Sequence, residues 1–328
     1  RTSSPSSSPT DPPEPILQVR TQAVTHGLNE RNVMKAFMTR RKSFFVAATA
    51  ALALSLSACG GGGTDAGGDP SVAAEPTFAA GTTMEKLASA GTIKIGTKYD
   101  QPLFGQVGLD GKPVGFDVEI GKLIAAKLGI PADKIEWSET VSANREPFIE
   151  QGKVDLVIAT YTINDKRKQV VSFAGPYYEA GQALMVNKDN DTIKTPEDVK
   201  GKKVCSVTGS TPAATIVDQY GAVLVPAATY SACLEPLRNK QVEAVTTDNV
   251  ILAGFVDKEP DAFKLASDET FTKEPYGIGL KKGDTEFRNW INDQLESFEE
   301  DGSYKKAWEA TAGSVIKTAP ELPEIDRY

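Results

Sequence analysis

The sequence predicts an α/β fold with mostly parallel sheets, on three observations. Short apolar segments alternate with amphipathic ones over most of residues 92–311, which is typical of repeated strand–helix units. The segment VDLVIA at 154–159 is almost entirely apolar, as expected for a strand buried on both faces of a parallel sheet. No unit of 20–50 residues recurs along the chain, so a repeat architecture is not indicated.

Residues 1–58 are expected to be removed from the folded protein. Residues 1–33 are rich in Ser, Pro and Thr and show no apolar periodicity. A basic stretch at 40–42 then precedes a weakly apolar run of about 15 residues at 44–58, shorter than the roughly 20 residues that span a bilayer. A basic segment followed by a short apolar run predicts a secretory signal peptide.

The run ends in LSACG at 56–60, which resembles the lipobox of bacterial lipoproteins. The resemblance implies that Cys59 becomes the acylated first residue and anchors the protein in lipid on the outer face of the cytoplasmic membrane. The alternative is a buried cysteine in a core helix, but the glycines that follow do not continue a helix. Residues 59–83 therefore read as the lipidated cysteine and a flexible tether rich in Gly, Ala, Asp and Pro.

Charge and histidine content exclude several classes of function. Residues 1–58 hold seven of the 36 Lys+Arg and three of the 44 Asp+Glu, so the remainder carries 29 basic and 41 acidic groups, a net charge near −12. Such a surface repels nucleic acid and anionic membranes. The one histidine, His26, lies in the removed segment, so the mature chain has no histidine for nucleophilic catalysis or an ordinary zinc site. We expect no metal and no cofactor.

Two cysteines remain after processing. Cys205 lies on an expected strand and Cys233 at the start of an expected helix 28 residues later. An oxidising compartment makes a disulfide between them reasonable, and closing that loop stabilises the fold by roughly 3 kcal/mol in the chain-entropy model. Two independent buried thiols are the alternative.

The expected elements form two series. In the first, a strand at 92–97 leads to a helix that Asp117 caps and Gly129 ends, then come a strand at 135–138, a helix at about 143–151 and the strand at 154–159. The second series begins with a helix start at Thr195. It continues with strands at 202–207, 222–225, 243–247 and 276–280, and with helices that end near 220, 239, 256, 300 and 311.

Polar residues follow three of these strands where ligands bind in such folds, beyond the carboxyl ends of the strands. Thr160 and Thr162 follow 154–159 with both hydroxyls on the same side, and Arg167 comes one helical turn later. A guanidinium beside hydroxyls matches a carboxylate. Each threonine is equally explained as a helix cap.

The other two strand ends add an anion site and an acidic group. Ser210 and Thr211 precede a helix N-terminus, where free N–H groups favour an anion. Asp248 follows the strand at 243–247 and is placed to receive an ammonium group, although it also fits a simple helix cap. Together the three strand ends describe the head group of a zwitterionic amino acid.

From about Ile93 to Trp308 the chain resembles the solute-binding family 3 of ABC transporters, the periplasmic-binding-protein type II proteins that bind polar amino acids. The matching segments are VGFDV at 114–118, GKVD at 152–155, TINDKR at 162–167, VSFAGPYY at 171–178, GKKV at 201–204, VEAVTTD at 242–248, EPYGI at 274–278, KGD at 282–284 and DGSY at 301–304. The resemblance implies two lobes joined by two crossing strands, near 185–188 and 272–276. Residues 84–186 and 274–318 would form lobe 1, and residues 187–273 lobe 2.

The resemblance also implies roles for residues at matching positions. Arg167 would bind the α-carboxylate with Thr162 and Thr211, while Thr160 and Asp248 would bind the α-ammonium. An aromatic residue from the first strand loop usually covers the ligand in this family, and Tyr99 or Phe104 is available. Ser210 stands where the family often has threonine and keeps the hydroxyl.

The ligand side chain is expected to be that of glutamate, with aspartate or glutamine as alternatives. The chain resembles glutamate-binding members in ATYT at 159–162, in NRE at 144–146 and in Lys98. A second carboxylate needs a second cation, and Lys98 and Arg145 are the basic residues available, unless they are surface charges.

We therefore expect a monomeric lipoprotein that captures glutamate by lobe closure and delivers it to an ABC permease. A ligand-binding sensor would use the same closure. A dehydratase-like enzyme on the same fold would need an acid–base pair, for which the mature chain offers carboxylates but no histidine.

Overall fold

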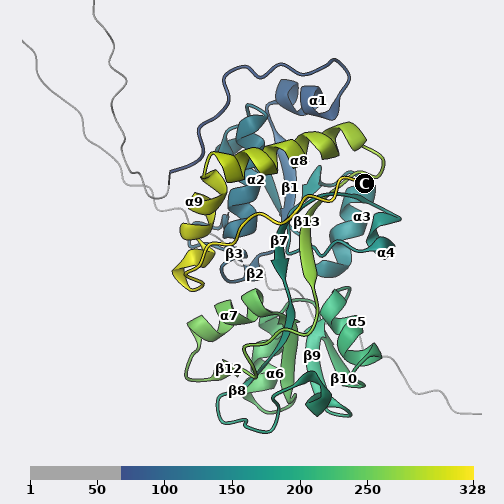
Figure 1. Ribbon diagram of the computed structural model, residues 1–328, viewed down its shortest axis with the longest axis vertical. Helices are drawn as coiled ribbons and strands as arrows, with labels where there is room; N and C mark the ends of the chain where they lie inside the picture. The colour runs from purple at the N-terminus through teal and green to yellow at the C-terminus, as the bar shows by residue number, and fades with distance from the viewer. Residues whose placement is uncertain (1–67) are drawn as a thin grey trace, which may run out of the picture. The chain divides into compact units, whose positions relative to one another are not determined.

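The computed structural model describes residues 68–328, which form the two lobes of an α/β fold (Figure 1). The expected signal peptide and Cys59 lie outside the described residues. Each lobe is built on a five-stranded sheet, with strand orders β5-β1-β6-β13-β7 and β10-β9-β11-β8-β12. In each sheet four strands run in one direction and a single strand, β13 or β8, runs against them. The predicted fold class is confirmed.

The sheet of lobe 1 combines strands from both ends of the described chain. Its members are β1 (Ile93–Thr97), β5 (Ile135–Glu139), β6 (Leu156–Val157), β7 (Ser172–Ala180) and β13 (Glu274–Leu280). Strand β6 lies in the middle and is wholly buried, which explains its apolar sequence. A small antiparallel sheet is added beside it, of β2 (Asp100–Gln101), β3 (Gly105–Val107) and β4 (Pro113–Val114).

The helices of lobe 1 pack on this sheet and on one another. They are α1 (Thr83–Ala90), α2 (Phe116–Lys127), α3 (Arg145–Glu150), α4 (Asp165–Lys168), α8 (Thr285–Glu300) and α9 (Ser303–Glu309), with short 3-10 turns η1 (Ala132–Lys134), η2 (Ser142–Asn144) and η5 (Ala312–Ser314). Helices α2, α8 and α9 contact each other, and α8 also lies against β7. An aromatic cluster fills the space beneath them, with Phe104, Phe116, Tyr178, Tyr276 and Trp308 in edge or stacked contact.

Lobe 2 follows the same plan on a smaller scale. Its strands are β8 (Gln182–Asn187), β9 (Lys203–Val207), β10 (Val223–Ala227), β11 (Ala244–Asp248) and β12 (Phe263–Leu265). Its helices are α5 (Thr211–Asp218), α6 (Leu234–Arg238) and α7 (Asn249–Lys258), with 3-10 turns η3 (Pro196–Val199) and η4 (Ser231–Cys233). Cys205 on β9 and Cys233 in η4 are joined by a disulfide.

The first crossing between the lobes differs from its expected place. We expected it near 185–188, with the lobe boundary at 186/187, but β8 already pairs with β11 and β12 of lobe 2. The chain crosses at Gly181, where a Cβ atom would lie 2.5 Å from Thr270 of the returning chain. The two crossings are hydrogen bonded, since Gln182 N donates to Thr272 Oγ1 over 3.0 Å.

The two ends of the described chain both pack on lobe 1. The tether expected over 59–83 is corrected in its second half, because Ala73 N donates to Ala126 O and the Phe78 ring meets that of Trp290. At the other end, residues 317–328 run across lobe 1 without regular secondary structure (Figure 1). Asp326 N donates there to Gly175 O on β7.

No helix among residues 68–328 combines the length and the apolar character that crossing a bilayer requires.

Candidate functional site

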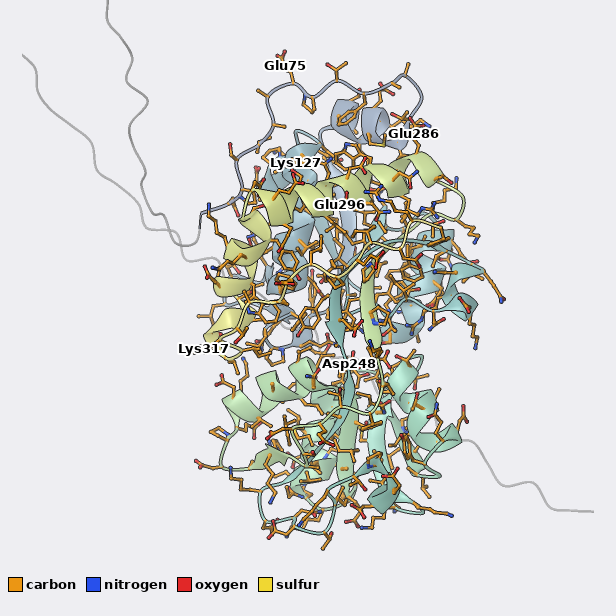
Figure 2. All side chains as sticks on the ribbon, viewed as in Figure 1. Glu75, Lys127, Asp248, Glu286, Glu296 and Lys317 are labelled. Carbon is orange, nitrogen blue, oxygen red and sulfur yellow. A yellow bond between two sulfur atoms is a disulfide. The ribbon has the colours of Figure 1, made fainter. Side chains whose placement is uncertain are left out.

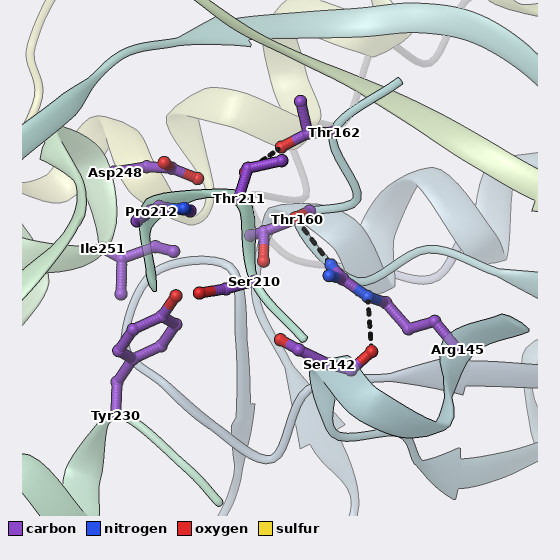
Figure 3. Close-up of a pocket in the computed structure, with 10 residues that line it drawn as sticks. All are labelled: Ser142, Arg145, Thr160, Thr162, Ser210, Thr211, Pro212, Tyr230, Asp248 and Ile251. Atoms are coloured by element: carbon purple, nitrogen blue, oxygen red, sulfur yellow. Dashed lines mark hydrogen bonds between the residues drawn. The ribbon is translucent and has the colours of Figure 1, made fainter. Parts of the chain in front are cut away.

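A cavity lies between the lobes and is lined by residues of both. Its walls are formed by Ser142, Arg145, Thr160, Thr162, Ser210, Thr211, Pro212, Tyr230, Asp248 and Ile251 (Figure 3). Polar groups from the three predicted strand ends therefore line one cavity. Figure 2 shows one of them, Asp248, where the two lobes face each other.

Thr160 is held in a fixed and uncommon backbone conformation. Its φ is +44°, in the left-handed region that a β-branched residue rarely adopts. Its N–H donates to Asp117 Oδ2 over 2.8 Å, and its hydroxyl donates to Gln101 Oε1 over 2.9 Å. The surroundings thus over-determine the conformation, as is common at binding sites.

Asp117 holds the main chain of Thr160 in place from inside lobe 1. It is fully buried at the start of α2 and accepts a second hydrogen bond, from the Tyr177 hydroxyl over 2.6 Å. Burial raises the pKa of Asp117 to about 7, against the lowering effect of these two hydrogen bonds. Sequence reasoning took Asp117 for a helix cap, but its carboxylate instead supports the cavity wall.

Lobe 2 contributes the start of α5. Ser210 is the N-cap, and its Oγ accepts from Ala213 N over 3.1 Å. Thr211 Oγ1 lies 3.3 Å from Thr162 Oγ1 of lobe 1, and both hydroxyls donate to Glu274 Oε2 over 2.7 Å. Glu274, at the start of β13, thereby joins the two lobes beside the cavity.

Asp248 ends β11 and lines the cavity. Its Oδ2 accepts from the Tyr276 hydroxyl over 2.5 Å, whereas its Oδ1 has no hydrogen-bond partner among residues 68–328. The residue is buried, at 3% exposed. Burial raises the pKa of Asp248 to about 7, and the negative charge of Glu274 adds to the rise. A buried carboxylate oxygen without a partner is unfavourable, and a cation in the cavity would satisfy it.

Of the two arginines that we expected at the ligand, Arg145 lines the cavity and Arg167 does not. Arg167 is turned to other partners: it donates to Thr162 O over 2.7 Å and to Gly209 O over 3.1 Å, and its Nε lies 3.3 Å from Glu146 Oε1. Burial and the neighbouring Arg145 charge lower the pKa of Arg167 to about 10. The sequence could not show that main-chain carbonyls would take up its donors.

Arg145 lines the cavity and, like Arg167, donates to main-chain carbonyls, among them that of Gly209. It donates to Ser142 O, Ala159 O and Thr160 O over 3.1–3.3 Å, and a longer contact of 3.5 Å reaches Gly209 O in lobe 2. The Tyr161 ring lies 4.3 Å from the Arg145 guanidinium and 5.0 Å from that of Arg167, so the ring stabilises two neighbouring cations. In Figure 3, Arg145 and Asp248 lie on opposite sides of the drawn pocket.

Lys98 is buried directly behind this wall. Its Nζ donates to Ser142 Oγ over 2.8 Å, and the residue is 3% exposed. Burial and the charge of Arg145 lower the pKa of Lys98 to about 7. Lys98 and Arg145 are therefore not surface charges, which was the alternative reading of both residues.

The two aromatic candidates do not cover the cavity. Phe104 is fully buried in the aromatic cluster of lobe 1, and Tyr99 is half-buried outside the lining. The aromatic wall is instead Tyr230, which is 3% exposed and comes from lobe 2. Sequence reasoning missed Tyr230, Ser142 and Glu274, because no strand-end pattern marks them.

Within the described part of the chain, no group of three or more His, Cys, Asp or Glu side chains is placed to hold a metal ion.

Residues 93–310 match the family of bacterial extracellular solute-binding proteins, family 3. The glutamate-binding protein GluB of Corynebacterium efficiens is 42% identical over 226 residues, which cover 66% of this chain and 77% of that protein. The glutamine-binding protein of Geobacillus stearothermophilus is 38% identical over 208 residues, with coverages of 63% and 79%.

Solved structures show the same fold. The solute receptor for L-cysteine of Neisseria gonorrhoeae superposes with a TM-score of 0.70 at 30% identity, over 74% of this chain and 100% of that chain. The family match, the curated relatives and the shared architecture agree. The chain belongs to the bacterial extracellular solute-binding proteins of family 3 and is a solute-binding protein, not an enzyme.

Proposed function

We propose that the protein captures glutamate in the cavity between its lobes, outside the cytoplasm, and delivers it to an ABC permease. The observation that carries the proposal is the free, buried Oδ1 of Asp248 on one side of a cavity whose other side presents the Arg145 guanidinium. Opposite charges on the two walls suit a ligand that bears an ammonium group and carboxylates.

The α-ammonium would bind at Asp248. Its free Oδ1 offers a charged acceptor, and the hydroxyl oxygens of Thr162 and Thr211 offer further ones. Both hydroxyls donate their single proton to Glu274, so towards the cavity they present lone pairs. Thr160 completes this end of the cavity from lobe 1.

The α-carboxylate would bind at Arg167, which does not line the cavity in this structure but donates to Thr162 O and Gly209 O beside it. The Arg167 guanidinium now donates to the neutral carbonyl of Gly209 over 3.1 Å. A carboxylate is a stronger acceptor than a carbonyl, so an entering ligand competes for this donor. The hydroxyls of Thr162 and Thr211, which we first expected to donate to the carboxylate, are already engaged with Glu274.

The side-chain carboxylate would bind at Arg145, Ser142 and Lys98. Arg145 and Ser142 line the cavity, and Lys98 donates to Ser142 from behind. An arriving anion would hold Lys98 in its charged form and offset its burial. GluB is named a glutamate-binding protein and the Geobacillus relative a glutamine-binding protein, so glutamine is the first competing ligand. Aspartate, which carries the same charged groups as glutamate, is the second.

Capture would proceed by closure of the lobes. Several hydrogen bonds now bridge them at the cavity. Among these, Gly209 O accepts from Arg145 and Arg167, Glu274 accepts from Thr211, and Asp100 accepts from Tyr230 N and Ser231 N. In an open form these bonds would be absent, and ligand binding would shift the population towards the closed form. We propose that the closed form docks on the permease, that the protein is a monomer, and that Cys59 carries its lipid anchor.

Isothermal titration tests the proposal on protein purified after export. We expect glutamate to bind with a micromolar or lower Kd, and Arg167→Ala to abolish binding of glutamate and glutamine alike. Arg145→Gln should weaken glutamate far more than glutamine, because glutamine lacks the second carboxylate. Absence of binding to glutamate, glutamine and aspartate would refute the proposal.

A matched control guards against loss of folding. Arg238 on lobe 2 is an exposed arginine that is paired with Glu235 and Glu259 and does not line the cavity, so Arg238→Gln should change neither affinity. The ratio of glutamate to glutamine affinity does not depend on the fraction of folded protein. An unchanged ratio in Arg145→Gln would therefore contradict the side-chain assignment.

A further inference from the structure

We propose that Asp100 is a positioning residue that holds the Tyr230 wall of the cavity against lobe 1 and so sets how long the ligand stays bound. The inference rests on the proposed capture by lobe closure and names a group that acts on the ligand through another residue. Asp100 itself does not line the cavity.

Asp100 joins the lobes by two main-chain hydrogen bonds. It lies on β2 in lobe 1, and its Oδ2 accepts from Tyr230 N over 2.8 Å and from Ser231 N over 3.2 Å, both in lobe 2. Bonds from N–H groups to a carboxylate are stronger than those to a neutral acceptor. Their donors belong to the segment that presents the Tyr230 side chain to the cavity.

On the lobe 1 side, the residue next to Asp100 contacts a residue that lines the cavity. The next residue, Gln101, is fully buried, and its Oε1 accepts from the Thr160 hydroxyl. Thr160 lines the cavity opposite the lobe 2 wall. The two-residue strand β2 thus touches one cavity wall through Gln101 and the other through Asp100.

The lobe 2 side is fixed by the disulfide. Cys233 comes two residues after Ser231 and is bonded to Cys205 on β9. The same strand continues into the turn that carries Gly209, Ser210 and Thr211. The disulfide therefore ties the segment that Asp100 grips to the strand that leads to α5, so that Tyr230 and the start of α5 move as one wall.

The position of the contact predicts a kinetic effect. Because its donor and acceptor lie in different lobes, the contact is made only when the lobes are together, after the ligand has met one of them. Loss of such a contact speeds reopening and leaves the first encounter unchanged, so the effect falls on the dissociation rate. The open form lacks this contact, so the substitution leaves that form unchanged.

The test is stopped-flow or surface-plasmon kinetics of glutamate binding to the exported protein. For Asp100→Ala we expect about a tenfold faster dissociation, because two charge-assisted bonds at a partly exposed site are lost. Asp100→Asn, which keeps an acceptor oxygen, should fall between Ala and the unmodified protein. Association should stay within about twofold for both variants.

Asp110→Asn is the matched control. Asp110 lies in the turn of the same small sheet, where its carboxylate accepts only from Lys112 N within its own loop among the described contacts. We expect no change in either rate. In the double variant Cys205→Ser, Cys233→Ser, dissociation should be faster than in the unmodified protein, and adding Asp100→Ala should accelerate it further by much less than tenfold.

The outcomes separate this inference from the proposed function. If the unmodified protein binds no amino acid, the proposed function fails. If it binds glutamate and Asp100→Ala leaves dissociation unchanged, the positioning role fails alone. A fall in melting temperature of ligand-free Asp100→Ala as large as that of the glutamate-bound variant also overturns it, because the contact would then be structural in every state.

Discussion

Asp248→Asn should weaken ligand binding and at the same time stabilise the ligand-free protein. Asp248 is 3% exposed, keeps one oxygen without a partner, and has its pKa raised to about 7 by burial and then by Glu274. The carboxylate is thus unfavourable until a cation arrives. Replacing it removes both the unfavourable charge and the attraction for the ligand ammonium.

The loss of affinity follows from Coulomb's law. Two unit charges at about 4 Å attract by about 4 kcal/mol at an effective dielectric constant of 20. Asparagine keeps a hydrogen-bond acceptor, so we expect a net loss of about 3 kcal/mol, or about a hundredfold in Kd. Titration calorimetry with glutamate measures it, and Asp248→Asn with a Kd within about threefold of the unmodified protein would refute the reasoning.

The gain in stability has a defined pH dependence. Keeping the Asp248 carboxylate ionised above pH 7 costs up to about 4 kcal/mol. We expect about half of this to be recovered, since the asparagine amide gains no new partner, and the melting temperature should rise by about 5 °C. Because the folded pKa is raised, the penalty is complete above pH 7 and fades as the pH falls towards the ordinary aspartate pKa. The difference between the variant and the unmodified protein should fade with it in calorimetric scans, and a difference that grows on acidification would contradict the assignment.

Three further predictions concern other parts of the site and the core. Burial and the charge of Arg145 lower the pKa of Lys98 to about 7, so glutamate binding above that pH must take up a proton. The affinity for glutamate should therefore fall as the pH rises from about 7 to about 9, whereas the affinity for glutamine should not. Calorimetric titration in buffers of different ionisation enthalpy measures the proton uptake. In α7, a Cβ atom at Gly254 would lie 2.9 Å from Pro102 of lobe 1, so Gly254→Ala should weaken glutamate binding. The melting temperature of the ligand-free protein should rise slightly, because alanine favours a helix. A fall in both the affinity and the melting temperature would point to misfolding. Phe104→Ala should destabilise the protein by about 3–5 kcal/mol in denaturant unfolding, as expected for a core phenylalanine, and an effect below about 1 kcal/mol would contradict its place in the core.

The strand ends were predictable because two local signals coincide there. Apolar strands are recognisable by composition, and ligands in α/β folds bind beyond their carboxyl ends. Thr160, Thr162, Ser210, Thr211 and Asp248 accordingly all line one cavity. These residues lie so close to their strands that main-chain direction alone settles where they go.

Residues with long side chains were less predictable. Arg167 has five N–H donors, and which acceptors they meet depends on the carbonyl of Gly209 in the other lobe. Tyr230 approaches the cavity on a segment whose place is set by the disulfide and by Asp100, both distant in sequence. The early crossing at Gly181 was missed because this one residue separates β7 from β8, with no longer run of turn residues to mark it.

The chain end that runs across lobe 1 bears on how the protein should be shortened for study. Strand β7 is the outer strand of its sheet, and Tyr328 Oη accepts from Phe173 N there, while Asp326 meets Lys168. The family match stops at residue 310. A chain shortened to that residue would lack the segment that covers β7, and the exposed edge strand could pair with that of another copy. Expression designs that retain residues 311–328 should therefore stay dispersed at concentrations where the trimmed form precipitates.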